Sequence, residues 1–137
     1  MDPLTILGAA AASMQLAEQV CCIVEFFSDL YGKAKEAPEL IRARLSHLEQ
    51  LISISKLIAR TEQLQTTEIQ KALVACLRYS LDLRQILNKF SAEEKGKLRR
   101  ALQSLKIVHK EDRITELLDK IEREKSSLAI CLHQVST

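Results

Sequence analysis

The sequence predicts an all-α fold, an antiparallel bundle of four to five helices with the first helix at its centre. The 137 residues include only three Gly, two Pro and 4% aromatic residues, whereas β-proteins use Gly and Pro in turns and aromatic side chains in strands. Apolar residues make up 47% of the chain and charged residues 28%, which is typical of a soluble globular domain. The apolar residues recur at the three- and four-residue intervals that place side chains on one face of a helix.

The first helix is expected to begin at the N-terminus. Asp2 can cap it, and Pro3 suits the first helical position, where its missing N–H costs nothing. Gly32 provides a C-terminal stop. The apolar face of this helix comprises Leu16, Ala17, Val20, Ile23, Val24, Phe27, Leu30 and Tyr31.

A second helix is expected from about Pro38 to about Arg60, and a capping box of Thr67 and Gln70 predicts the start of a third. The buried face of the second helix comprises Ile41, Leu45, Leu48, Leu51, Ile52, Ser55 and Ile58. The buried face of the third comprises Ile69, Leu73, Cys76, Leu77, Ser80, Leu83 and Leu87.

A second capping box, Ser91 with Glu94, predicts the start of a fourth helix, and the polar stretch 109–112 is expected to interrupt the chain before the last one. The fourth helix would bury Leu98, Ala101, Leu102, Leu105 and Val108. The last would bury Ile114, Leu117, Leu118, Ile121, Leu128, Cys131, Leu132 and Val135. Short connections are typical of an up-and-down bundle, and without repeats or linkers we expect one domain over residues 1–137.

Catalytic chemistry has little support in the sequence. The Glu-x-x-His pattern of di-iron bundles is absent, because Arg44, Lys106 and Ile130 stand three positions before the histidines His47, His109 and His133. The three glycines are isolated, so they form no phosphate-binding loop. We therefore expect no enzyme, no cofactor and no metal site. A pairing of Cys76 or Cys131 with a distant His stays open at this stage.

The cysteines indicate a reducing compartment. Cys21 and Cys22 are neighbours, which rarely bond to each other, and the chain has no Cys-x-x-Cys spacing. A secretory signal needs a basic start, whereas here Asp2 and Pro3 follow Met1. We expect free thiols and a cytoplasmic protein.

The net charge of +2 is unevenly distributed. Residues 1–32 hold four acidic side chains and no Lys or Arg, whereas residues 33–137 hold twenty basic and fourteen acidic ones. The candidate anionic-lipid patch comprises Lys95, Lys97, Arg99, Arg100, Lys106 and Lys110. The alternative is a solvated helix face. Nucleic acid is not expected as a partner, because Phe90 is the one aromatic residue near this charge.

The first helix combines a core pattern with a marginal membrane-spanning pattern. Pro3–Ala17 is uncharged but only about 22 Å long as a helix, and extension to Val24 gives about 33 Å at the cost of enclosing Glu18. One central acid costs about 3 kcal/mol on insertion scales. The membrane-insertion candidates are Leu4, Ile6, Leu7, Met14 and Leu16. The alternative is that this helix is solely the central helix of the bundle.

Four segments carry a resemblance to a known family: MDPLTILGAAAASMQLAEQV at the start, APELIRARLSHLEQLISI, the Leu-rich IQKALVACLRYSLDLRQIL, and RITELLDKIEREKSSLAICL near the end. In these segments the chain resembles the HeLo-like N-terminal domain of fungal NLR-like and related STAND proteins. The resemblance covers essentially the whole chain. The chain departs from many members in having no Trp before the last helix, where Arg99 and Arg100 stand.

The resemblance implies an N-terminal effector module of a longer chain, joined to nucleotide-binding and sensor domains. Its relatives act in programmed cell death, heterokaryon incompatibility and innate immunity by oligomerising and attacking the plasma membrane. The expected function is therefore a cell-death effector or signalling module with conditional plasma-membrane association and no catalytic residues. The expected partners are further copies of the chain, anionic lipids and its own C-terminal domains. The alternative is a protein-interaction adaptor that self-associates or recruits a partner without membrane contact.

Overall fold

The computed structural model describes residues 8–32, 38–103 and 109–136. Within these ranges the chain forms five α-helices, one 3-10 turn and no strand. The helices are α1 (Ala9–Tyr31), α2 (Glu39–Ala59), α3 (Thr67–Asn88), α4 (Ala92–Gln103) and α5 (His109–Ser136), and the turn η3 (Glu62–Leu64) precedes α3. The prediction of an all-α bundle is confirmed.

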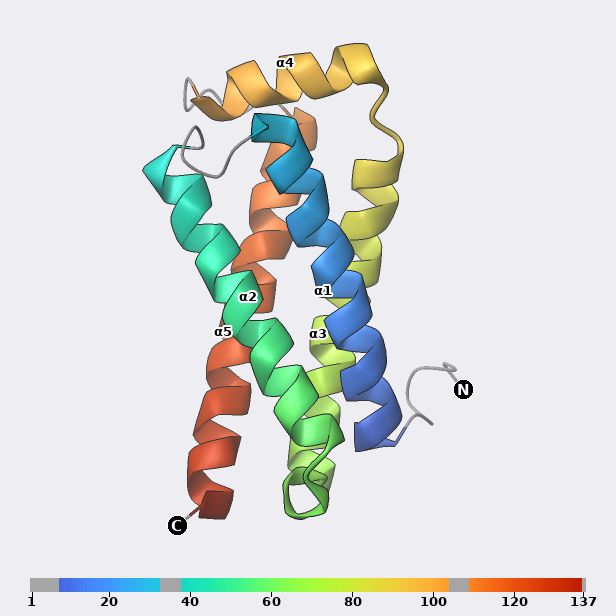
Figure 1. Cartoon of the computed structure of the whole chain (residues 1–137), viewed down its shortest axis with the longest axis vertical. Helices are drawn as coiled ribbons and strands as arrows, with labels where there is room; N and C mark the ends of the chain where they lie inside the picture. Colours follow the sequence, from blue (N-terminus) through green and yellow to red (C-terminus); the bar gives the residue numbers. More distant parts are fainter. Residues whose placement is uncertain (1–7, 33–37, 104–108, 137) are drawn as a thin grey trace.

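Four helices run lengthwise and one crosses their end (Figure 1). In this view α1 and α3 run upward, α2 and α5 run downward, and α4 lies across the top of the bundle. The helix α1 packs mainly against α2 and α3, and α3 packs in turn against α5. The central position of the first helix stays a prediction.

The helix boundaries agree with the capping signals, with three corrections. Gly32 ends α1 with a φ of 70°, a left-handed conformation that suits glycine. The first correction is that α1 begins at Ala9, because Gly8 has an extended ψ of 163° and interrupts any helix from Pro3. Asp2 and Pro3 themselves lie outside the described residues.

The cap of α3 is Thr66 and not Thr67, because Thr66 has the extended backbone and its hydroxyl accepts the N–H of Ile69 at 3.2 Å. The cap of α4 is as predicted, with the Ser91 hydroxyl accepting the N–H of Glu94 at 3.2 Å. The third correction is that residues 109–112 do not interrupt the chain but form the first turn of α5.

The predicted faces enclose one apolar core. Leu48, Leu77 and Leu118 are 2%, 0% and 5% exposed, and every residue of the predicted α3 face is buried. Four residues of the predicted faces are only half-buried, namely Val24, Ile52, Cys131 and Leu132. Val135 was predicted inside but is 39% exposed, because it lies in the last turn of α5. Ala101, Leu102, Leu105 and Val108 lie outside the described side chains.

A polar seam joins α2 to α5. The Arg44 guanidinium pairs with Asp119 at 2.5 Å and with Glu122 at 3.0 Å. Burial alone would lower the pKa of Arg44, but these two carboxylates outweigh burial and raise it. Lower down, the Lys125 ammonium contacts His47 Nδ1 at 2.8 Å and donates to the side-chain oxygen of Gln50. Charged and polar contacts therefore join α2 to α5 near the surface, whereas the interior of the bundle is packed mainly with apolar side chains.

We predict that Leu77→Ala lowers the free energy of unfolding by about 2–5 kcal/mol, because it leaves a cavity in the core. Leu57→Ala is the control, since Leu57 is 39% exposed and its loss should change stability by no more than about 0.5 kcal/mol. Urea denaturation followed by circular dichroism measures both. Equal effects of the two substitutions would contradict the assignment of the core.

Candidate functional site

The candidate site lies where α4 crosses the C-terminal end of α1. Leu98 is fully buried and anchors α4 to the bundle, as predicted. Phe90, just before α4, is half-buried and packs against the core. Its ring meets Phe26 of α1 at 6.4 Å between centroids, in an edge-to-face arrangement. These contacts hold a short, charged helix across the end of the bundle.

The predicted lipid patch divides into two pairs of side chains. Lys95 and Arg99 face α1, with the Lys95 ammonium 5.5 Å from the centroid of the Phe26 ring and the Arg99 guanidinium 5.8 Å from that of Tyr31. Lys97 and Arg100 are exposed and make no ion pair with a described residue. Lys106 and the side chain of Lys110 lie outside what the structure describes. The four described residues of the patch therefore divide between the contact with α1, which Lys95 and Arg99 make, and the exposed surface of α4, which carries Lys97 and Arg100.

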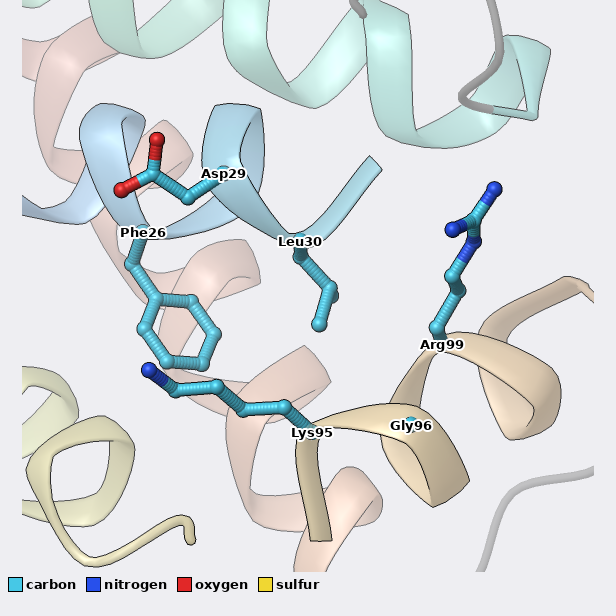
Figure 2. A pocket seen from close by; sticks show the side chains of 6 residues that line it. All are labelled: Phe26, Asp29, Leu30, Lys95, Gly96 and Arg99. Carbon is cyan, nitrogen blue, oxygen red and sulfur yellow. The ribbon is translucent and has the colours of Figure 1, made fainter. Parts of the chain in front are cut away.

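A pocket of about 270 Å³ opens between α1 and α4. It is lined by Phe26, Asp29, Leu30, Lys95, Gly96 and Arg99. Figure 2 shows the Lys95 side chain lying along the Phe26 ring, with Arg99 on the far side of Leu30. A Cβ built on Gly96 would meet no atom within 4 Å, so this side of the pocket is open space.

The pocket combines an apolar floor with a charged rim. Phe26 and Leu30 supply the floor, while Lys95 and Arg99 place two positive charges opposite the single carboxylate of Asp29. Lys95 and Arg99 are among the residues predicted from the sequence, whereas Gly96 and the lining residues of α1 are not. The signal for them in the sequence is the adjacent aromatic pair Phe26 and Phe27 near the end of the first helix.

Beside the pocket, Tyr31 is fully buried, and its hydroxyl has no hydrogen-bond partner among the described residues. Burial raises the pKa of Tyr31, and the nearby Arg99 charge opposes part of this increase. The buried, neutral phenol of Tyr31 and the Arg99 guanidinium over its ring are thus part of the contact between α1 and α4.

The predicted insertion candidates are separated by the fold. Leu4, Ile6 and Leu7 lie outside the described residues. Met14 is 63% exposed, whereas Leu16 is 0% exposed and belongs to the core. In this bundle the two therefore cannot meet the same surface.

Among the described residues, α1 is the one helix long and apolar enough to cross a membrane. Its inner face belongs to the core, and the core helix of a soluble protein can have the same length and apolar composition. The start of α1 lies at the end of the bundle opposite to α4 (Figure 1). The two predicted membrane elements are thus at opposite ends of the closed molecule.

The outer face of α1 is acidic. Glu18, Glu25 and Asp29 are exposed and form no ion pair with any residue that the structure describes. No Lys or Arg occurs in residues 1–32 to offset them. This face therefore carries negative charge along most of the bundle, while α4 presents positive charge at its end.

The cysteine and histidine side chains are spread over the bundle. Cys76 is fully buried, and burial together with the Glu124 charge raises the pKa of its thiol, which keeps it protonated. Cys131 is half-buried on α5, and all four cysteines are free thiols. The structure places no group of three or more His, Cys, Asp or Glu within reach of one metal ion in the described ranges.

Comparisons of the chain with protein-family models, with curated proteins and with solved structures find no match.

We predict that the Tyr31 phenol ionises above the ordinary pKa of about 10. With Tyr79→Phe, Tyr31 is the remaining one of the two tyrosines, and the ultraviolet absorbance of phenolate follows it alone. Adding Arg99→Gln should move the midpoint higher, because the lost positive charge favoured phenolate. Since the folded pKa is raised, the stability from buried Tyr31 is present below pH about 10 and is lost as pH rises through the folded value. A midpoint at or below that of free tyrosine would contradict this environment.

Proposed function

We propose that this chain is an effector or signalling module that acts by oligomerisation and conditional membrane association, of the kind that precedes the nucleotide-binding domain of fungal NLR-like receptors. The observation that supports the proposal is the double character of α1. Its 23 residues span about 35 Å, which exceeds the bilayer core of about 30 Å, and the same helix supplies the core face of the bundle. Such a helix has two environments in which its apolar side chains are buried.

Insertion is conditional because α1 is buried in the resting bundle. Each large side chain such as Leu16, Ile23 or Phe27 would lose about 1.5–3 kcal/mol on exposure to water. Lipid tails replace the apolar surroundings, so this term is largely recovered if α1 passes from the core into a membrane. What remains is the cost of the acids within α1, which is about 3 kcal/mol for Glu18 near the bilayer centre and is increased by Glu25 and Asp29 toward the other end. Pairing of these acids within an oligomer would offset that cost, which links insertion to assembly.

Lys97 and Arg100 are the residues we assign to the first membrane contact. Both are exposed and neither lines the pocket, and each basic residue near an anionic surface contributes about 1 kcal/mol. The acidic face of α1 opposes a side-on approach to the same surface. The molecule would therefore approach with α4 first, and α1 would enter only after it leaves the bundle. In a cell this describes a cytoplasmic module that reaches the plasma membrane when activated.

The second candidate is a protein-interaction adaptor that self-associates or recruits a partner without lipid contact. The observation that favours it is the opposite charge of two exposed surfaces, the outer face of α1 and the face of α4. Neither needs a membrane to find a complementary surface. Vesicle binding by the wild-type chain distinguishes the two candidates.

We predict that Lys97→Glu with Arg100→Glu weakens binding to vesicles containing phosphatidylserine by at least about tenfold, and that the wild-type affinity falls as salt is raised. The matched control is Arg42→Glu with Lys56→Glu, which makes the same charge change on exposed positions of α2. Vesicle sedimentation measures both variants. If both pairs weaken binding equally, net charge and not the α4 surface governs attachment.

We further predict that Ile6→Asp or Leu7→Asp sharply reduces dye leakage from these vesicles, because the charge precedes α1 and must enter the bilayer with the start of that helix, at a cost of up to about 3 kcal/mol that is smaller near the interface. Both positions precede Ala9, so the melting temperature should stay close to that of wild type. Ala43→Asp adds the same charge at an exposed position of α2 and serves as the control. A wild-type chain that neither binds nor permeabilises vesicles, even when oligomerised by a fused partner, removes the membrane proposal and leaves the adaptor.

A further inference from the structure

The residues that line the pocket between α1 and α4 suit an apolar side chain with a carboxylate beside it. Its floor of Phe26 and Leu30 suits an aliphatic or thioether group, and the open space beside Gly96 gives access to it. Lys95 and Arg99 lie one helical turn apart on the rim and favour a carboxylate. Asp29 makes the same rim unsuitable for a group with several negative charges.

The same chain carries a group with these properties. Met14 is 63% exposed on the outer face of α1, the largest exposure among its large apolar side chains. Glu18 follows one turn later on the same face, is exposed, and has no ion pair with a described residue. Met14 and Glu18 lie about 6 Å apart along the helix, which is close enough for both to contact one pocket.

We propose that this pocket receives Met14 of a second copy of the chain, with Glu18 of that copy beside Lys95 and Arg99. The inference rests on the proposed oligomerisation and names the surfaces that carry it. Methionine is flexible and its sulfur packs favourably against aromatic rings, so Phe26 is a suitable floor for it. Removing Met14 from water adds apolar burial, while the opposite charges fix the register of the two helices.

The positions of the two surfaces determine the kind of assembly. Met14 lies in the first half of α1, and the pocket lies at the opposite end of the bundle, where α4 crosses (Figure 1). A contact between different surfaces of identical chains is heterologous, so copies add head to tail and form a ring or an open filament. Lys97 and Arg100 lie on another side of α4 and stay available to lipid in such an assembly.

The first test changes the size of one side chain on each of the two surfaces. Met14→Ala removes the inserted side chain, and Gly96→Leu fills the pocket from a position where added atoms meet open space. Each should raise the dissociation constant for self-association by about tenfold or more, measured by sedimentation velocity from micromolar to millimolar concentration. Ile130→Ala and Gly96→Ala are the matched controls: Ile130 is 60% exposed on α5, and a methyl group leaves most of the pocket empty. Circular dichroism verifies that all four variants fold.

The second test reverses the charges. Glu18→Lys and Lys95→Glu should each abolish assembly when studied alone, and an equal mixture of the two should restore it, because every contact then joins opposite charges. Glu49→Lys on the exposed face of α2 is the control and should assemble as wild type does.

The outcomes separate the inference from the proposed function. If the wild type assembles but Met14→Ala, Gly96→Leu and the charge-reversed chains assemble equally well, oligomerisation stands and this interface is wrong. If each reversed chain fails alone and the mixture also fails, the pairing of Glu18 with Lys95 is overturned. If the wild type is a monomer in solution and by cross-linking on phosphatidylserine vesicles, both the inference and the proposed oligomerisation are overturned.

Discussion

The burial of the inner face of α1 is the constraint on which the rest of the structure depends. Leu16, Val20, Ile23 and Phe27 are each at most 1% exposed, and α2 and α3 close over them. Packing therefore fixes the inner face of α1, and its outer face is the part of the helix that can contact other molecules. That outer face carries the acidic residues and the exposed Met14.

The position of α4 follows from the same constraint. The helix α1 ends at Gly32, and Phe26, Leu30 and Tyr31 in its last turns contact or face α4. The short helix α4 covers this end with the fully buried Leu98, and its Lys95 and Arg99 lie over aromatic rings of α1. A pocket remains between the two helices, and Gly96 borders it where a side chain would meet open space.

Most of the fold could be predicted from residue spacing, because the three- and four-residue periodicity reports directly on which side of a helix is buried. All seven predicted residues of α3 are inside for this reason. Boundaries were less certain, since Thr66 and Thr67 offer the same capping chemistry and only the backbone decides between them. The pocket could not be foreseen, because Phe26 and Lys95 are far apart in sequence and meet only when α4 folds back across α1. The split of the basic patch likewise depends on the rotation of α4 about its axis, which composition does not encode.

The seam between α2 and α5 has a consequence for how the bundle responds to its surroundings. Arg44 and Lys125 link these two helices through charged and polar groups near the surface, while α1 meets α2 and α3 mainly through apolar side chains, with a hydrogen bond from Arg84 of α3 to Gln19 of α1. Dissolved ions screen contacts between exposed charges and leave apolar contacts almost unchanged. Raised ionic strength therefore weakens the contact of α5 with α2 more than it weakens the apolar packing around α1.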